Sequence, residues 1–496
     1  MMLGVLSPAA AFMLRMKVKP VLGVLAKVLI IMATFMATSL VWVFWYHEAG
    51  LLKPWIIAIT ITLVPGLILT ALVKRQHEGL RIKEGYLTVT LAWLLMGISG
   101  SLPFILTGAI PSFVDALFES ISGLTTTGSS ILSDVEALPK SLLYWRSLTH
   151  WIGGMGIIVL VIAILPALRI AGYHLITLET SGKDPEKIIP RTSDTARVLW
   201  LIYIAMTAIL LLLLVVGGMD FFDALCHAFG TVATGGYSTK NASVGYYSSY
   251  IQYVIMTFML LAGINFSLYI FLIKGDFRRI LRNTELKAYL MTIMAVGLLI
   301  TFIIHTSNGF ASEEAFRSSF FQVISIITAT GFATADYMQW KESAWMLILS
   351  LMFIGACVGS TGGGIKVIRH VIAFRNIQLY FTRQLHPKLV KPLRVNGLAV
   401  SEDRVNATVT FIFLYLLIVA LSALLMAGLG LDTQTSLGAV LATMGGIGPG
   451  IGMVGPAGNF SFIPEAGKLY LSLLMILGRL EIMTVLVLFS PSFWRR

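Results

Sequence analysis

Apolar runs about as long as a membrane is thick recur along almost the whole sequence. An α-helix needs about 20 mostly apolar residues to cross the hydrocarbon core of a bilayer. Ten such runs can be drawn, near residues 27–46, 52–73, 85–108, 146–168, 197–218, 248–273, 286–305, 343–373, 406–430 and 467–490. Only 12% of the residues are charged, about half the share of an ordinary soluble domain. The sequence therefore predicts an all-α polytopic membrane protein with ten transmembrane spans.

The basic residues are distributed unevenly between the two sides that ten spans would create. Of the 36 Lys and Arg residues, 27 fall in the termini and alternate connections of one side, and 7 fall in those of the other side. Connections rich in Lys and Arg stay in the cytoplasm, so both termini are predicted to be cytoplasmic. The formal net charge of +12 is then a topological signal, and no nucleic-acid partner is expected. The basic connection 374–405 can contact anionic lipid or a regulatory protein.

Four connections on the external side are unusual for loops. Residues 112–127, 221–235, 313–330 and 432–447 are too apolar for free loops and too short to cross the bilayer. Apolar segments of this kind are often re-entrant, and non-helical backbone at membrane depth is tolerated only inside protein or beside a water-filled cavity. Each segment has a predicted span before it and another after it. We therefore predict four units of span, short re-entrant helix, non-helical exit and span.

The four segments end alike, in exits rich in Thr and Gly. The exits contain Thr126-Thr127-Gly128, Thr234-Gly235-Gly236, Ala329-Thr330-Gly331 and Gly446-Ile447-Gly448. Asp115 lies 13 residues before Gly128 and Asp223 lies 13 before Gly236, which favours Gly236 over Gly235 as the aligned glycine. Internal repeats indicate one supersecondary unit used several times. The predicted divisions are two extra spans in residues 1–80 and pore repeats in 81–182, 183–280, 281–390 and 391–496.

Backbone of this kind can bind a cation that has lost its water shell. Carbonyl oxygens of converging strands replace the water, glycine permits the backbone conformations that this needs, and short helices point negative C-terminal dipoles toward the ion. The exits carry no carboxylate, which argues against an acidic ring for divalent cations. For a single copy, helix capping by a Thr-Gly pair is the alternative. Four copies at matching positions favour a cation filter.

The exits also resemble a known family. Their motifs are Thr125-Thr-Thr-Gly128, Gly235-Gly-Tyr-Ser-Thr239, Thr328-Ala-Thr-Gly-Phe-Ala-Thr-Ala-Asp336 and Gly448-Pro-Gly-Ile-Gly452. They resemble those of the TrkH/TrkG/KtrB superfamily of potassium-translocating membrane subunits, and the two extra spans are similar to the TrkH/TrkG branch. The resemblance covers nearly the whole chain. It implies one K⁺-channel-like pore with pseudo-four-fold symmetry, a homodimer, a place in the bacterial inner membrane, and a cytosolic nucleotide-binding partner of the TrkA type.

The resemblance further implies which residues meet the ion. K⁺ is expected at Thr126, Thr127, Thr234, Gly235, Ala329, Thr330, Gly446 and Ile447, and Gly128, Gly236, Gly331 and Gly448 complete the filter. Rb⁺ is expected to pass, and Na⁺ to pass less readily. The chain is expected to bind no cofactor besides K⁺, because any nucleotide would lie on the partner subunit. The fourth exit, with Thr443-Met-Gly-Gly446, departs from the Asn often found there in the family.

Glycines interrupt the eighth apolar run. They are Gly355, Gly359, Gly362, Gly363 and Gly364, and each costs a helix about 1 kcal/mol relative to Ala. We predict an intramembrane gate loop here, with Lys366 at its cytoplasmic end. A kinked helix packed through small residues is the alternative. A phosphate-binding loop is excluded by spacing, since Ile365 separates Gly364 from Lys366.

Two charges lie within the tenth run. Arg479 is mid-span, and a central Arg costs several kcal/mol unless it faces a cavity or a partner. We predict that Arg479 repels or spaces cations below the filter and contributes to gating, and the family resemblance implies the same. A structural ion pair without a role in conduction is the alternative. Glu481 lies two residues further on and is expected to pair with Lys366 or another basic group.

Three function classes can be weighed on these residues. The favoured one is K⁺ uptake through a gated selective pore. A symporter coupled to H⁺ or Na⁺ is the alternative, but such carriers often have inverted repeats and midplane carboxylates, whereas these repeats share one orientation and only Glu481 is acidic mid-span. A membrane enzyme would need a nucleophile, base or metal cluster, and no recognisable spacing of that kind is present. The protein is therefore not expected to be an enzyme.

Overall fold

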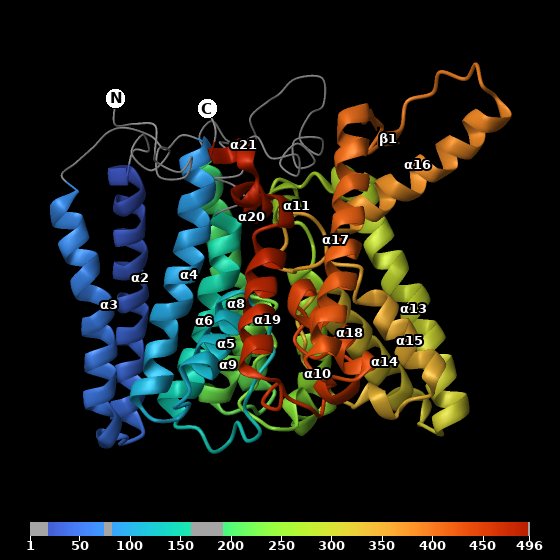
Figure 1. The fold of residues 1–496 in the computed structure, drawn as a ribbon. Helices are drawn as coiled ribbons and strands as arrows, with labels where there is room; N and C mark the ends of the chain where they lie inside the picture. The colour runs from blue at the N-terminus through green and yellow to red at the C-terminus, as the bar shows by residue number, and fades with distance from the viewer. Residues whose placement is uncertain (1–17, 74–81, 160–191, 495–496) are drawn as a thin grey trace, which may run out of the picture.

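The computed structural model describes residues 18–73, 82–159 and 192–494, and these are mostly helical (Figure 1). The long or paired helices are α2 (Val18–Trp45), α3 (Leu52–Leu72), α4 (Ile82–Leu106), α6 (Lys140–Val159), α8 (Thr192–Val216), α10 (Ser249–Ala262), α11 (Phe266–Ile273), α13 (Thr284–Asn308), α15 (Glu342–Leu351), α16 (Val367–Leu385), α17 (Glu402–Gly428), α19 (Glu465–Arg479) and α20 (Ile482–Phe489). Four helices that follow the long helices α4, α8, α13 and α17 are short: α5 (Phe113–Leu124), α9 (Phe221–Val232), α14 (Ser312–Ile327) and α18 (Thr433–Gly445).

Membrane-spanning helices can be recognised by length and apolarity. Among the described residues, six helices qualify (α2, α3, α4, α8, α13 and α17), and up to eight qualify if each of two bent pairs counts as one span. The apolar helix α15 is too short to cross alone. The predicted span 146–168 runs on from α6 into residues outside the described part. A mostly helical membrane fold with six to eight apolar spans among the described residues is thus confirmed, while the ten spans stay a prediction.

Two of the predicted spans are sharply bent. The pair α10 and α11 meets at 94°, and the pair α19 and α20 meets at 116°. The first bend has its own N-cap, since the Asn265 side chain accepts from Ser267 N at 2.8 Å. At the second bend Glu481 has a φ of +59°, which breaks the helical backbone. The runs 248–273 and 467–490, each drawn as one span, are therefore broken segments.

The outer helices present apolar side chains to their surroundings. On α3 the exposed side chains include Ile61, Leu67 and Leu72, and on α13 they include Met291 and Phe302. In water such rows would be unfavourable, but in a bilayer apolar side chains are the ones that face lipid. These helices therefore suit the lipid bilayer that the sequence predicts around this protein.

The four short helices form the interior. Three of them begin with a side-chain cap: Ser112, Asp220 and Asp432 accept from Asp115 N (3.4 Å), Phe222 N (3.0 Å) and Thr435 N (3.0 Å). Such caps satisfy the otherwise unpaired first amides of a helix. Their C-terminal halves are buried, with residues 118–124, 226–232, 319–327 and 438–445 fully inside the protein. The non-helical exits that follow them therefore lie inside the bundle.

One element projects from the bundle. Helix α16 slants away from the other helices (Figure 1) and leads to a two-stranded hairpin, β1 (Arg394–Val395) with β2 (Leu398–Ala399). The hairpin turns at Asn396 and Gly397, with φ of 52° and 81°, as a two-residue turn requires. Asn396 Oδ1 accepts from Thr284 N at 2.7 Å, which ties the hairpin to the start of α13. The remaining short elements are η1 (Ala49–Leu51), η3 (Ser243–Tyr246), α12 (Phe277–Arg282), η4 (Tyr337–Gln339), η5 (Gly452–Val454) and α21 (Pro491–Trp494).

Candidate functional site

The four exits have one backbone design. The first residue of each lies in the left-handed region, with φ of 54° at Thr126, 55° at Thr234, 56° at Ala329 and 66° at Gly446. The next residue donates its amide to the carbonyl five residues back, as Thr127 N does to Ser122 O at 2.9 Å. Gly235, Thr330 and Ile447 repeat this bond to Gly230, Ser325 and Ala442 at 2.7, 2.8 and 2.8 Å. In three exits a non-glycine residue (Thr126, Thr234 or Ala329) adopts this strained left-handed conformation. The surrounding packing therefore imposes the turn.

The aligned glycines come next in each exit. Their φ values are 84° at Gly128, 83° at Gly236, 83° at Gly331 and 100° at Gly448, a region that costs other residues conformational energy. The structure therefore puts Gly236, and not Gly235, in register with Gly128. In all four exits two left-handed residues flank one ordinary residue.

The exits lie side by side in a closed ring. A Cβ added to Gly128 would overlap the carbonyl oxygen of Gly235, and one added to Gly236 would overlap that of Thr330. A Cβ at Gly331 would overlap the oxygen of Ile447. A Cβ at Gly448 would lie 2.8 Å from Thr127 O, and Ser129 Oγ donates to Gly448 O at 2.9 Å. The ring thus runs from exit one through two, three and four back to one.

All the residues predicted for the filter are therefore brought together. The ring contains the carbonyl oxygens of Thr127, Gly235, Thr330 and Ile447, one from each exit. The four aligned glycines also line a single hollow, together with Ser129, Tyr237 and Pro449 among others. Backbone arranged in this way offers oxygen dipoles without a fixed charge, the type of group that replaces water around a monovalent cation.

The predicted gate loop lies against the C-terminal ends of three of the four short helices. Helix α15 ends at Leu351 and α16 begins at Val367, so the segment between them is not one kinked helix. Thr361 Oγ1 donates to Val232 O of α9 at 3.2 Å. A Cβ at Gly362 would lie 2.6 Å from Thr328 O, after α14, and one at Gly363 would overlap Gly445 O of α18. The loop therefore lies next to the point where three of the four exits begin, at the ends of α9, α14 and α18.

Other predicted gate residues shape the loop itself. Gly355 N donates to Ile365 O at 2.8 Å, Gly364 packs against Gly355, and Lys366 Nζ donates to Gly362 O. Gly359 is turned away from these, because its carbonyl accepts from Phe266 N of α11 at 3.1 Å. The loop is thus folded back on itself and anchored in the bend between α10 and α11.

Arg479 bridges the gate loop and α6. It is the last residue of α19 and only 6% exposed. Its Nη1 donates to Thr361 O at 2.6 Å and its Nη2 to Gly153 O at 3.0 Å, while its Nε has no partner among the described residues. The nearby Glu481 pairs with Arg369 and not with Lys366. Within the described part of the chain, the hydrogen-bond partners of Arg479 are therefore two backbone carbonyls and no carboxylate.

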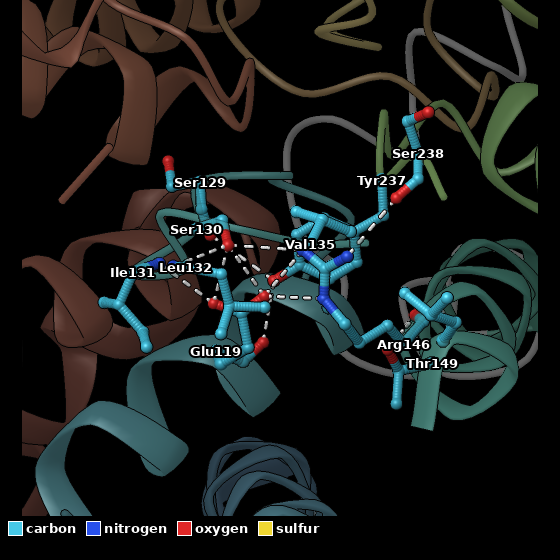
Figure 2. Close-up of polar contacts among 12 residues, drawn as sticks. Glu119, Ser129, Ser130, Ile131, Leu132, Val135, Arg146, Thr149, Tyr237 and Ser238 are labelled. Atoms are coloured by element: carbon cyan, nitrogen blue, oxygen red, sulfur yellow. Dashed lines mark hydrogen bonds and ion pairs between the residues drawn. The ribbon is translucent and has the colours of Figure 1, made fainter. Parts of the chain in front are cut away.

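A buried ion pair that the sequence reasoning missed lies beside the first two exits (Figure 2). Arg146 Nη2 is 2.8 Å from Glu119 Oε1, and the two side chains are 2% and 0% exposed. Arg146 is one of the seven basic residues that the predicted topology assigns to the external side, and the sequence predicts no other role for it. The available signal was Glu119, a carboxylate within an apolar re-entrant segment, where a buried charge must find a partner.

Glu119 belongs to a set of four aligned positions. The spacings of the aligned glycines place it in register with His227, Gln322 and Ala439. Three members support their own exit: Glu119 accepts from Ile131 N at 3.0 Å, His227 Nε2 bonds Ser238 Oγ at 2.9 Å, and Gln322 Nε2 donates to Ala335 O at 3.2 Å. Ala439 can form no such bond. In the fourth exit Gly450 O instead accepts from Tyr337 Oη at 2.6 Å.

The segments that follow exits one and two are also hydrogen-bonded to each other. Asn241 Oδ1 accepts from Val135 N at 2.7 Å, and its Nδ2 donates to Asp134 at 2.8 Å. This second bond lowers the pKa of the Asp134 carboxyl below its ordinary value, because it favours the ionised form. The segments after exits one and two are therefore tied together outside the ring as well as beside it.

These features define a class of protein. Apolar helices surround a closed ring of uncharged backbone, and the described residues contain no group of three or more His, Cys, Asp or Glu placed to hold a metal. That is the architecture of a membrane transport protein. The chain belongs to the TrkH family, whose profile carries the description "Cation transport protein" and matches residues 53–496.

Known relatives agree with this assignment. The Trk system potassium uptake protein TrkH of Escherichia coli K12 is 39% identical over 429 residues, covering 85% of this chain and 88% of the relative. The TrkH protein of Halomonas elongata is 36% identical, covering 90% and 93%. The crystal structure of the potassium transporter TrkH from Vibrio parahaemolyticus superposes with a TM-score of 0.89 at 33% identity, over 97% of this chain and 100% of that one. These relatives are transporters, so the expectation that the protein is not an enzyme is confirmed.

Proposed function

We propose that this protein takes up K⁺ across the bacterial inner membrane through a gated selective pore. The observation that carries the proposal is the closed ring of four exits, in which each aligned glycine packs against the carbonyl of the next exit. A ring of backbone carbonyls can replace the hydration shell of K⁺. The relatives are named as potassium uptake proteins, which supports K⁺ as the ion.

The ion would bind within the four exits. Its proposed ligands are the residues predicted above, in which Thr127, Gly235, Thr330 and Ile447 provide the ring carbonyls. The four exits differ in sequence, so discrimination against Na⁺ is expected to be weaker than in a ring of identical strands. Rb⁺ should pass with K⁺. The wider arrangement would comprise ten spans, with both termini cytoplasmic and the exits entered from outside.

Gating would involve the loop below the ring. The contacts of Gly362 and Gly363 with the ends of α14 and α18 support a loop that can block the path. Arg479 joins this loop to α6 through two carbonyls and brings a buried positive charge to the inner side of the exits. We assign it the role of opposing cation passage until the loop moves.

Control would come from outside the chain. A homodimer and a cytosolic nucleotide-binding subunit of the TrkA type are proposed as partners on the basis of family membership. The projecting hairpin and α16 carry Arg375, Arg383 and Arg394 and are bonded to α13, so they are a surface on which such a subunit could act. No cofactor other than K⁺ is proposed for this chain.

The test is ion flux into liposomes that contain the purified protein. Uptake of K⁺ or Rb⁺ should exceed uptake of Na⁺ and should proceed without a pH gradient or a Na⁺ gradient. Strict dependence on either gradient would favour the symporter instead. Equal uptake of K⁺ and Na⁺ would contradict a selective pore.

A further inference from the structure

The Glu119–Arg146 ion pair is buried beside the outer side of the ring. Arg146 Nε and Nη2 both lie 2.8 Å from Glu119 Oε1. Removing two charges from water costs several kcal/mol per ion, and the pair offsets this only with good geometry and further hydrogen bonds. Those bonds are present, since Ser130 Oγ and Ile131 N both donate to Glu119 at 3.0 Å. The pair is thus held by the first exit.

The same pair also holds the second exit. The Arg146 guanidinium lies over the Tyr237 ring, 3.9 Å from its centroid, and its Nη1 donates to Ser238 O at 3.4 Å. Tyr237 Oη donates back to Glu119 O at 2.9 Å and to Ser129 O at 3.3 Å. Figure 2 shows these residues gathered around Glu119 and Arg146. The residues after Gly128 and after Gly236 are therefore joined through one cluster.

His150 of α6 forms a second bridge between α5 and Tyr237. His150 Nδ1 bonds Gly123 O at 2.7 Å, and its Nε2 accepts from Tyr237 N at 3.1 Å. Its ring also packs against the Tyr237 ring at 4.1 Å. Tyr237 is therefore fixed by its amide, its ring and its hydroxyl, and all three contacts lead to α5, α6 or the first exit.

The other junctions of the ring are joined by single hydrogen bonds, such as Tyr337 Oη to Gly450 O between the segments of exits three and four and Ser129 Oγ to Gly448 O between exits one and four, but among the described residues none of them has a buried ion pair. At the positions aligned with Glu119, His227 and Gln322 form hydrogen bonds within their own repeats, His227 reaches the third exit only by stacking on the Phe332 ring, and Ala439 has no polar side chain. Among the ion pairs of the described residues, this is the one whose two side chains are both less than a tenth exposed. The junction between exits one and two is therefore the most strongly cross-linked.

We propose that Glu119 and Arg146 are positioning residues that set ion specificity by fixing the distance between exits one and two. The proposal rests on the selective pore proposed above. Selectivity depends on whether the carbonyl oxygens can move inward to coordinate an ion smaller than K⁺, and therefore on the stiffness of the backbone that carries them. A cross-link between adjacent exits limits that adjustment. Without it, Gly128 and the Gly235 carbonyl can separate, and the ring loses its fit to K⁺.

The test compares the ratio of K⁺ to Na⁺ flux in liposomes, a quantity independent of how much protein is correctly inserted. The wild-type protein is measured first. Equal K⁺ and Na⁺ flux in the wild type would contradict the proposed function itself and not the role of this pair. With a selective wild type, Glu119→Gln and Arg146→Met should each lower the ratio about tenfold, a factor that needs only about 1.4 kcal/mol, and Arg146→Lys should retain part of it.

Two further variants make the test decisive. Tyr237→Phe removes the two hydroxyl bonds and leaves both charges in place, so it should lower the ratio less than the charge variants do. This variant tests the proposal even if the charge variants do not fold. Asp115→Asn is the matched control, because Asp115 pairs with the buried Lys468 at 2.6 Å and joins α5 to α19 without contacting an exit. It should leave the ratio unchanged. Unchanged ratios in conducting Glu119→Gln, Arg146→Met and Tyr237→Phe proteins, or an equal fall in Asp115→Asn, would overturn the proposal.

Discussion

The Gly236 backbone lies against the carbonyl oxygen of Thr330, with no room between them for a Cβ atom. The two residues belong to different exits, 94 positions apart in the sequence, yet they are in van der Waals contact. The same relationship recurs at the other three junctions. The ring is therefore a packed structure whose circumference is set by the absence of side chains.

The first prediction concerns this contact. Gly236→Ala should lower the preference for K⁺ over Na⁺ at least about tenfold, a factor that needs only about 1.4 kcal/mol, because the methyl group must push exits two and three apart. The measurement is the flux ratio in liposomes. Gly218→Ala is the control, since Gly218 has a similar φ of 89° but nothing within 4 Å of its Cβ position. An equal loss in both variants would mean that backbone strain, and not spacing, is responsible.

A second prediction compares two glycines of the fourth exit. Gly446 has room for a Cβ, with its nearest neighbour at 3.9 Å, whereas Gly448 faces Thr127 O at 2.8 Å. Both have positive φ, so alanine should cost each about 1–2 kcal/mol of backbone strain. Gly446→Ala should keep its selectivity and Gly448→Ala should lose it. The reverse order would show that the ring contact is not what selects the ion.

A third prediction concerns the buried arginine. Arg479→Ala should raise K⁺ flux several-fold, because it removes a buried positive charge from the path and frees Thr361 of the gate loop. Arg479→Lys should raise it less, since a lysine keeps the charge but cannot reach two carbonyls with one planar group. The exposed Arg279 on α12 supplies the control Arg279→Ala. If flux and its dependence on the regulatory subunit do not change in Arg479→Ala, Arg479 has no role in gating.

A fourth prediction concerns how the gate loop is held. Glu285 Oε1 accepts from Val358 N at 2.8 Å and from Ile368 N at 3.2 Å, so one buried carboxylate ties the middle of the loop to the first turn of α16. Glu285→Ala leaves the buried Ile368 amide and the partly buried Val358 amide without that partner, which costs about 1–3 kcal/mol for the buried one. Hydrogen exchange across residues 352–369 should become faster, and basal flux should rise. The control is Glu342→Ala, at an exposed position on α15. Unchanged exchange in the loop would contradict this role for Glu285.

Much of this arrangement could be predicted from the sequence because it depends on local chemistry. Apolar length predicts the helices, and the Asp-to-Gly spacing places Gly236 in register with Gly128, two glycines whose φ values are 83° and 84°. The glycines between Gly355 and Gly364 predict a break in the eighth run, and α15 and α16 are indeed separate helices. In each case the residue type itself limits the backbone.

The rest depends on contacts between distant segments. Glu119 and Arg146 lie 27 residues apart, and Ser238 is a further 92 residues away, so no local pattern connects them. The bends at Asn265 and Glu481 lie inside apolar runs whose composition suits a continuous helix. The sequence predicts only that Glu481 meets Lys366 or another basic group, and the folded structure selects Arg369 of α16 by bringing it to this bend. Tertiary pairing, and not propensity, decides these features.

The most direct test of the central claim is to locate the ion. Crystals or liposome-embedded particles prepared with Rb⁺ or Tl⁺ in place of K⁺ would reveal the bound ion by its strong scattering. The account predicts density inside the ring of exits, within coordination distance of carbonyl oxygens of Thr127, Gly235, Thr330 and Ile447, and a loss of that density in Gly236→Ala. An ion bound elsewhere in the protein, with none in the ring, would contradict it.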